Sequence, residues 1–126
     1  MIRGTTTQFK FTLPYTKEEI EFVTIKFWQK NNHALTPITR GLADCANPLD
    51  SKELSVSLTA EETLRFSEKY KGRVQLRGMC KNTGTVFASK QQLFTVYPLS
   101  DDLSGDITVP PNDEGWVILD GDVILT

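Results

Sequence analysis

The sequence predicts an all-β fold, an antiparallel immunoglobulin-like β-sandwich with one short helix. Apolar and polar residues alternate with a period of two in about seven segments between residues 5 and 97, and this alternation is typical of half-buried strands. Turn residues separate the segments at spacings typical of a sandwich. The predicted strands do not alternate with helical segments, so the sequence does not indicate a parallel sheet.

The first half of the chain contains the clearest strands. Phe9, Phe11 and Leu13 share one face of the segment "TTQFKFTLP", which Pro14 ends. "YTKEE" then has the spacing of a capping box and predicts at most one helical turn. The strongest strand follows at residues 21–29, "EFVTIKFWQ", and a turn at residues 31–32 comes next. Pro37 cannot donate a ladder hydrogen bond, so the segment around it is expected at a sheet edge or a bulge.

The second half repeats this pattern around one helix. After the loop "ADCANPLDSK", the segment "ELSVSLT" alternates cleanly, and Thr59 with Glu62 forms a capping box that starts a helix near residues 60–67. "GRVQLRGMC" is the next strand. Gly84 is expected to take a positive φ in the hairpin loop "KNTG". The returning strand "TVFASKQQLFTVY" has a predicted break near "KQQ", and Pro98 stops it.

The alternation also predicts which side chains form the core. Each expected core residue lies on the more apolar face of its segment. These residues are Phe9, Phe11, Leu13, Val23, Ile25, Phe27, Leu54, Val56, Leu58, Leu64, Phe66, Val74, Leu76, Phe94 and Val96.

Charge divides the chain into a sandwich domain at residues 1–97, an acidic Pro/Gly/Ser linker at 98–115 and a strand-like tail at 116–126. Residues 1–96 hold all 14 Lys and Arg and carry a net charge of +5, whereas residues 97–126 hold seven acids and no base. Such asymmetry often marks a segment with a separate role. The acidic part is either a solvated linker or a segment that folds against a basic face, its own or a neighbour's.

The tail is apolar on both faces if it forms a strand, because Trp116 and Ile118 alternate with Val117 and Leu119. Burying such side chains is favourable by roughly 1.5–3 kcal/mol each. We therefore expect residues 116–125 to add to a sheet edge, with a turn at "DG". The edge belongs to the same chain or to a neighbouring copy; a neighbour is favoured, which makes the tail a contact of a homo-oligomer.

The sequence contains no motif for catalysis, a cofactor or a metal. The sole histidine, His33, lies in a polar turn and is expected to be solvated. Cys45 and Cys80 are expected to be free, small apolar residues, since two cysteines and one histidine cannot complete a four-ligand zinc site. The oxygen-rich "DGDV" at 120–123 could attract calcium, but turn formation by Asp-Gly explains it without metal. The chain is therefore predicted not to be an enzyme.

Six bases cluster in the sequence around the predicted helix and the strand after it: Arg65, Lys69, Lys71, Arg73, Arg77 and Lys81. Nucleic acid is not the expected partner, because the chain is acidic overall and the cluster has one aromatic residue, Tyr70. The cluster is either ordinary solvated charge or a contact for the acidic tail. The basic contact face predicted for that second case consists of Arg65, Lys69, Arg73 and Arg77.

The N-terminal region shows neither a signal peptide nor a membrane span. Its first ten residues, "MIRGTTTQFK", lack an apolar core, and no segment approaches the roughly 18 apolar residues of a membrane helix. We expect no membrane partner.

Several stretches resemble a family of small proteins encoded in phages and prophages of Firmicutes. They are the opening "MIRGTT" with "FKFTLP", then "VTIKFWQ", "SVSLTAEETLRF" and "GRVQLRGMCKNTGTVFAS", and separately the end "GWVILDGDVI". Thr7 and Ala60 depart from the Pro and Gln usual in the family. The layout is also similar, more distantly, to the immunoglobulin-like N-terminal domain of phage baseplate upper proteins.

The resemblance implies a virion structural or adaptor protein that binds other phage structural proteins, located in the virion or the host bacterial cytoplasm. It implies no catalytic residue. An alternative function, from the residues themselves, is a carbohydrate-binding module on a virion surface that uses Trp28 or Trp116. Phe22 and Trp28 share one face of the strand at residues 21–29, and packing against a second layer of the core explains these two aromatic residues as well as sugar binding does.

Overall fold

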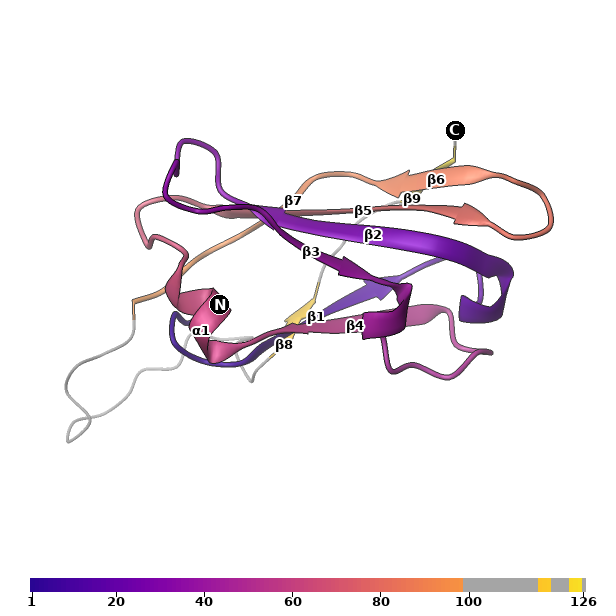
Figure 1. The fold of residues 1–126 in the computed structure, drawn as a ribbon, viewed down its shortest axis with the longest axis horizontal. Coiled ribbons are helices and arrows are strands. Elements are labelled where there is room, and N and C mark those ends of the chain that lie inside the picture. Colours follow the sequence, from indigo (N-terminus) through magenta and orange to yellow (C-terminus); the bar gives the residue numbers. More distant parts are fainter. Residues whose placement is uncertain (99–115, 119–122, 126) are drawn as a thin grey trace.

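The computed structural model describes residues 1–98, 116–118 and 123–125, and it places them in two β-sheets (Figure 1). Sheet I has the strand order β4-β1-β8. Sheet II has the order β3-β2-β5-β6-β9, and β7 also pairs with β5. The strands are β1 (Thr7–Thr12), β2 (Ile20–Trp28), β3 (Ile38–Gly41), β4 (Glu53–Leu58), β5 (Gly72–Cys80), β6 (Val86–Ser89), β7 (Gln92–Phe94), β8 (Trp116–Ile118) and β9 (Val123–Leu125).

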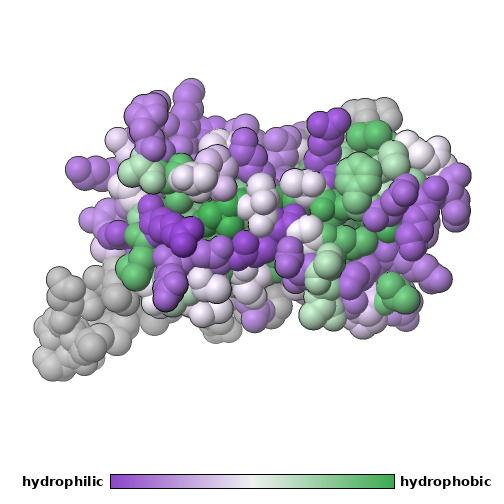
Figure 2. Space-filling model, viewed as in Figure 1, coloured by the Kyte–Doolittle hydropathy of each residue, from purple (hydrophilic) through white to green (hydrophobic). Residues whose placement is uncertain are grey.

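The two sheets pack face to face through aromatic rings. The ring of Phe9 on β1 lies 4.8 Å, centroid to centroid, from Phe27 on β2 and 5.1 Å from Phe94 on β7. In Figure 2 hydrophobic side chains gather between the two layers, and hydrophilic side chains cover much of the remaining surface. The predicted β-sandwich is therefore confirmed.

The strand pairing is that of an immunoglobulin-type sandwich. β1 pairs with β4, and β2 pairs with both β3 and β5, all antiparallel. β5 in turn pairs with β6 and β7. These pairs correspond to B–E, C–C′, C–F and F–G of the immunoglobulin scheme. β8 occupies the edge beside β1 that strand A takes in that scheme, but it runs parallel to β1.

Most predicted core residues are buried, because strict alternation holds along β1, β4 and β5. The prediction for Leu64 is wrong: its side chain is 48% exposed. The helix α1 (Ala60–Leu64) instead buries Thr63, which lies three positions before the buried Phe66 and so shares its side of the helical turn. Further core residues are Met1, Ile20, Leu35, Ile38, Cys45, Cys80 and Phe87.

Ile20 is buried because β2 contains a bulge. The register with β5 shifts between Ile20 and Phe22, which leaves Glu21 as an extra residue. An extra residue reverses the alternation beyond it. Ile20 therefore points inward although Phe22, two residues later, is exposed.

The predicted local signals occur in the structure. Thr16 and Glu19 form a capping box at the 3₁₀ turn η1 (Lys17–Glu19), and Thr59 and Glu62 form another at α1. A second 3₁₀ turn, η2 (Leu42–Asp44), lies in the segment expected to be a loop. Gly84 has a φ of +65°. β3, which follows Pro37, is an edge strand.

The C-terminal strands lie on the flank opposite β3 and β4. β8 pairs with β1 in parallel, with Trp116 beside Gln8, and β9 pairs with β6, with Leu125 beside Phe87. In this single chain both segments extend its own sheets, and pairing with a neighbouring copy stays a prediction. Residues 99–115 of the linker predicted at 98–115, and Leu119 of the predicted tail contact, lie outside the described residues.

No helix in the described part of the chain is long and apolar enough to cross a lipid bilayer.

Candidate interaction surface

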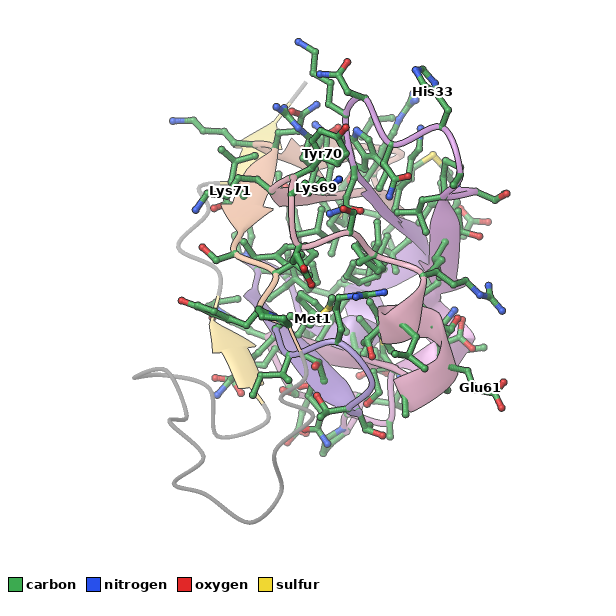
Figure 3. The ribbon with its side chains drawn as sticks, turned by 90° about the vertical axis from the view of Figure 1, so that its left-hand side faces the viewer. Met1, His33, Glu61, Lys69, Tyr70 and Lys71 are labelled. Carbon is green, nitrogen blue, oxygen red and sulfur yellow. The ribbon has the colours of Figure 1, made fainter. Side chains whose placement is uncertain are left out.

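The four predicted basic contact residues do not form one surface. Arg65 and Lys69 follow α1 and line a hollow of about 330 Å³ together with Arg3 and Asn32. Arg73 and Arg77 belong to β5, on the side of sheet II that faces away from the core. Figure 3 shows Lys69, Tyr70 and Lys71 on the turn that leads into β5.

One cation beside the hollow, Arg3, forms hydrogen bonds and an ion pair within the fold. Arg3 donates from Nη2 to the carbonyl of Leu64 at 2.9 Å, and its Nη1 lies 3.4 Å from Glu68 Oε2. The Glu68 carboxylate also lines the hollow. Arg3 thus fastens the N-terminal segment to the end of α1, which leaves the hollow little free charge beyond Arg65 and Lys69.

The outward side of sheet II carries a different set of side chains, which we call the basic-aromatic face. It consists of Phe22, Lys26 and Trp28 on β2, Arg73, Arg77 and Met79 on β5, and Leu93 on β7. Cross-strand register places them side by side: Trp28 beside Arg73, Phe22 beside Met79, and Leu93 on the other side of Arg73. Neighbours in register on one face are within contact distance.

Large apolar groups and cations are both accessible on this face. Phe22 is 47% and Leu93 is 56% exposed. Lys26 and Arg77 are exposed, and Arg73 is half-buried. Lys26 Nζ lies 5.1 Å above the centroid of the Trp28 ring, a cation–π contact.

The cations of the basic-aromatic face have no carboxylate partner among the described residues. Arg73 donates from Nη1 to the amide oxygen of Gln91 at 2.7 Å, which leaves its charge uncompensated. The ion pairs within the described residues join Arg3 to Glu68, Lys10 to Glu53 and Arg40 to Glu62. Three cations beside exposed aromatic and aliphatic groups are therefore available to a partner.

The outward side of sheet I contrasts with this surface. Gln8 and Lys10 of β1 lie there beside Ser57 and Ser55 of β4, and Lys10 forms an ion pair of 3.1 Å with Glu53. None of these side chains is a large apolar group. A polar hollow of about 330 Å³ lies at this side, lined by Gln8, Asp44, Ala46, Asn47, Pro48, Ser55 and Ser57.

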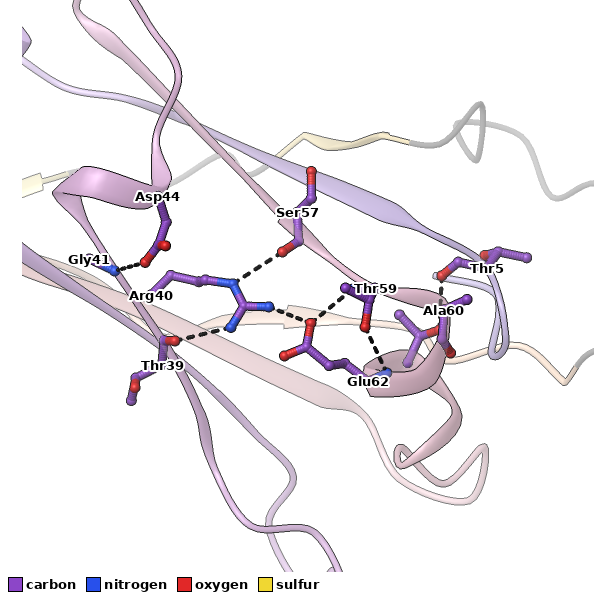
Figure 4. Close-up of polar contacts among 10 residues, drawn as sticks. Thr5, Thr39, Arg40, Gly41, Asp44, Ser57, Thr59, Ala60 and Glu62 are labelled. Carbon is purple, nitrogen blue, oxygen red and sulfur yellow. Dashed lines mark hydrogen bonds and ion pairs between the residues drawn. The ribbon is translucent and has the colours of Figure 1, made fainter.

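On the flank of β3 and β4, the side chain of Arg40 joins the two sheets (Figure 4). Arg40 of β3 donates from Nε to the carbonyl of Ser57 on β4 at 3.2 Å, and its Nη2 is paired with Glu62 at the start of α1. The hydrogen bond from Arg40 is the main cause that holds the pKa of the Glu62 carboxyl below its usual range. This network is structural, since its groups satisfy one another.

The described residues contain no cluster suited to catalysis or metal binding. No three His, Cys, Asp or Glu side chains within these residues converge on one point. His33 is exposed, and Figure 3 shows it at the upper right of this end of the molecule, well apart from Glu61 at the lower right. Cys45 and Cys80 are both free and buried, and burial raises the pKa of the Cys45 thiol to about 11. The calcium candidate at 120–123 lies largely outside the described residues.

Sequence reasoning identified part of the basic-aromatic face. It considered Phe22 and Trp28 as either a sugar-binding surface or core packing, and it predicted Arg73 and Arg77 as part of a basic contact face. It missed Met79, although continued alternation along β5 places Met79 with Arg77. It also missed Leu93, which is recognised from the register of β7 against β5.

Comparison of the chain with models of protein families, with curated proteins and with solved structures found no match.

Proposed function

We propose that this protein is a non-enzymatic structural or adaptor component of a phage or prophage particle, which binds other virion subunits through the basic-aromatic face. The observation that carries the proposal is the chemistry of that face. Phe22, Trp28, Met79 and Leu93 are exposed or half-buried beside cations that lack carboxylate partners among the described residues. Aromatic residues, Met and Arg are enriched in protein–protein interfaces.

The virion setting rests on the resemblance of the opening, the α1 region and the C-terminal stretch to phage proteins. The sandwich supports a binding role because its flat sheet face can present several anchors in fixed register. A protein partner with carboxylates around an apolar centre would complement this face.

The test is affinity purification of the tagged protein from phage-producing cells, followed by mass spectrometry of the co-purified proteins. We expect virion subunits, and we expect their loss in the variant Phe22→Ser, Arg73→Glu, Arg77→Glu. A matched control, Lys10→Glu with Lys52→Glu, changes charge elsewhere and should retain the subunits. Enrichment of replication or lysis proteins, or equal capture by the face variant, would contradict the proposal.

A second candidate function is carbohydrate binding at the polar hollow of sheet I. The Gln8 amide and the Ser57 hydroxyl line it and make no side-chain hydrogen bond within the described residues, and Trp116 lies beside Gln8 in register. Free amides and hydroxyls are donors and acceptors that suit a sugar. Trp28 is less suited, because Lys26 covers one side of its ring. Saturable signals on a glycan array, lost in Trp116→Ala and Gln8→Ala, would support this function over the first.

A further inference from the structure

We propose that the basic-aromatic face of one copy binds the acidic segment 99–115 of a second copy of this chain. The inference rests on the proposed function and names one partner for the same surface. The occupant is chosen by charge: residues 97–126 contain seven acids and no Lys or Arg. Five of these acids, Asp101, Asp102, Asp106, Asp113 and Glu114, fall within the segment.

The spacing of charges fits an extended segment laid along β5. Arg73 and Arg77 are four residues apart on one strand, which corresponds to roughly 13 Å. Asp102 and Asp106 are also four residues apart in the sequence. An extended segment in that alignment brings each carboxylate to one guanidinium, and arginine holds carboxylates by paired hydrogen bonds.

The apolar residues of the segment match the rest of the face. Leu103, Ile107 and Val109 are interspersed among the acids. Phe22 and Leu93 are the accessible apolar groups of the face. Leu93 lies beside Arg73 in register, and Phe22 lies beside Met79, two residues along β5 from Arg77. A contact of this kind combines apolar burial with charge pairing, which gives both affinity and a fixed alignment.

A second copy is the favoured source because the segment's own ends are held away from this face. Before the segment, Tyr97 is bridged to Ile2 and accepts a hydrogen bond from Arg3 at 3.0 Å. After it, Trp116 is paired with Gln8 in sheet I. The basic-aromatic face lies on the far side of sheet II, beyond the packed interior, and sheets pack roughly 10 Å apart.

The contact joins two different surfaces, because each copy has one face to offer and one segment to donate. Two copies that exchange segments form a closed two-fold dimer, whereas head-to-tail repetition produces a larger ring or an open chain of copies.

Two charge variants test the proposal by complementation. The face variant is Lys26→Glu, Arg73→Glu, Arg77→Glu, and the segment variant is D101N, D102N, D106N, D113N, E114Q. Sedimentation velocity of the full-length proteins measures association at about 50 mM and about 500 mM NaCl. We expect concentration-dependent association of the unchanged protein that weakens by about tenfold or more at the higher salt, and monomers for each variant alone.

The decisive sample is the equimolar mixture of the two variants. The segment variant has an intact face and the face variant has an intact segment, so the mixture should form a one-to-one complex that does not grow further. Circular dichroism melting of each variant checks that both are folded, and Lys10→Glu with Lys52→Glu serves as the charge control. A monomeric unchanged protein, association of either variant alone, or no complex in the mixture overturns the inference. Capture of virion subunits is measured separately and can succeed while self-association fails.

Discussion

Gln29 and Ser67 exchange a pair of hydrogen bonds between a strand end and a turn. Gln29 Nε2 donates to the Ser67 carbonyl at 2.7 Å, and Gln29 Oε1 accepts from the Ser67 amide at 2.8 Å. Gln29 Nε2 also donates to the carbonyl of Tyr70, and Gln29 Oε1 also accepts from the side-chain amide of Asn32. The buried amide of Gln29 is thereby satisfied at both ends, and it fixes the turn that leads into β5.

Replacing this amide should strongly destabilise the protein. Gln29→Leu leaves the Ser67 amide without its acceptor, while the Ser67 carbonyl keeps only the long 3.5 Å hydrogen bond from the Tyr70 amide. A buried group that loses its partner costs about 1–3 kcal/mol. We expect the free energy of unfolding in urea to fall by about 2–4 kcal/mol with an unchanged slope. Asn32→Ala removes one donor to Gln29 and the exposed acceptor of the Ala34 amide, and it should cost less than half of that. A Gln29→Leu protein as stable as the original would contradict this account.

The Arg40–Glu62 pair should stabilise the fold in a pH-dependent way. Its side chains are 19% and 16% exposed, and we expect Arg40→Met to lose about 1–3 kcal/mol at neutral pH. The folded-state pKa of Glu62 lies below its ordinary value of 4.5, chiefly because Arg40 donates to it. The stabilisation is therefore present above pH 4.5 and is lost as the pH falls through the folded pKa.

Unfolding curves between neutral and acidic pH measure this dependence. The difference between the unchanged protein and Arg40→Met should shrink as the pH falls below 4.5. Glu62→Gln keeps an acceptor for the Thr59 amide but removes the charge, so the Arg40→Met effect in that background should not vary over this window. A constant difference at all pH values in the original background would refute the assignment.

Thr7 offers a stabilising substitution. Its side chain is buried, and its hydroxyl has no hydrogen-bond partner in the described structure. Thr7→Val replaces that hydroxyl by a methyl group of similar size, and we expect a gain of about 1 kcal/mol and a higher Tm. Thr7→Ser keeps the hydroxyl and loses the methyl group, so its Tm should fall. Equal changes in both variants would count against an unsatisfied hydroxyl.

Two inward-facing glycines should not accept a methyl group. A Cβ at Gly78 would lie 2.7 Å from both the Phe22 carbonyl oxygen and the Phe87 ring, and one at Gly72 would lie 2.1 Å from the Phe94 ring. We expect Gly72→Ala and Gly78→Ala each to cost about 1–3 kcal/mol. Gly41→Ala, whose nearest neighbour is 3.8 Å away, is the control and should cost much less. In a double-mutant cycle, Phe94→Leu should relieve part of the Gly72→Ala loss but none of the Gly78→Ala loss.

Cys45 should be unreactive in the folded protein. Burial raises the pKa of its thiol from an ordinary 9.0 to about 11, so the thiolate fraction at pH 8 falls by about 100-fold. Alkylation followed by mass spectrometry should modify Cys45 slowly in buffer and rapidly in urea. Because the folded pKa is raised, this group's contribution to stability is full below pH 9 and is lost as the pH rises toward 11. Cys45→Ala should remove that part of the alkaline slope, and rapid native labelling would contradict the prediction.

Period-two alternation predicted the strands and most of the core because both sheets bury one face. It failed where the period changes. The bulge at Glu21 turned Ile20 inward, and no residue type at that position announces an extra residue. In α1, strand-like spacing selected Leu64, whereas the helix places Thr63 against the core, where it donates to the Thr5 carbonyl and accepts from the Gly4 amide.

The interaction surface was harder to predict because it depends on register. The sequence cluster from Arg65 to Lys81 suggested one basic face. The turn before β5 separates Arg65 and Lys69 from Arg73 and Arg77, and alternation then divides β5 between core and surface. Leu93 joins the face through pairing with a strand twenty residues earlier. Contacts between residues so far apart in the sequence depend on strand pairing, so local composition does not predict them.

The pairing of β8 with β1 has a consequence for folding kinetics. Gln8 and Trp116 are separated by more than 100 residues, so their contact closes a very long loop and carries a large entropic cost before it forms. The sandwich of β1 to β7 can assemble first through shorter connections, with the edges of β1 and β6 still bare. Bare edges invite pairing between molecules, and the carboxylates that flank both terminal strands repel the same acidic region of another copy. The acidity of this region therefore disfavours pairing between two C-terminal regions during the slowest interval of folding, when aggregation competes most directly with the native pairing.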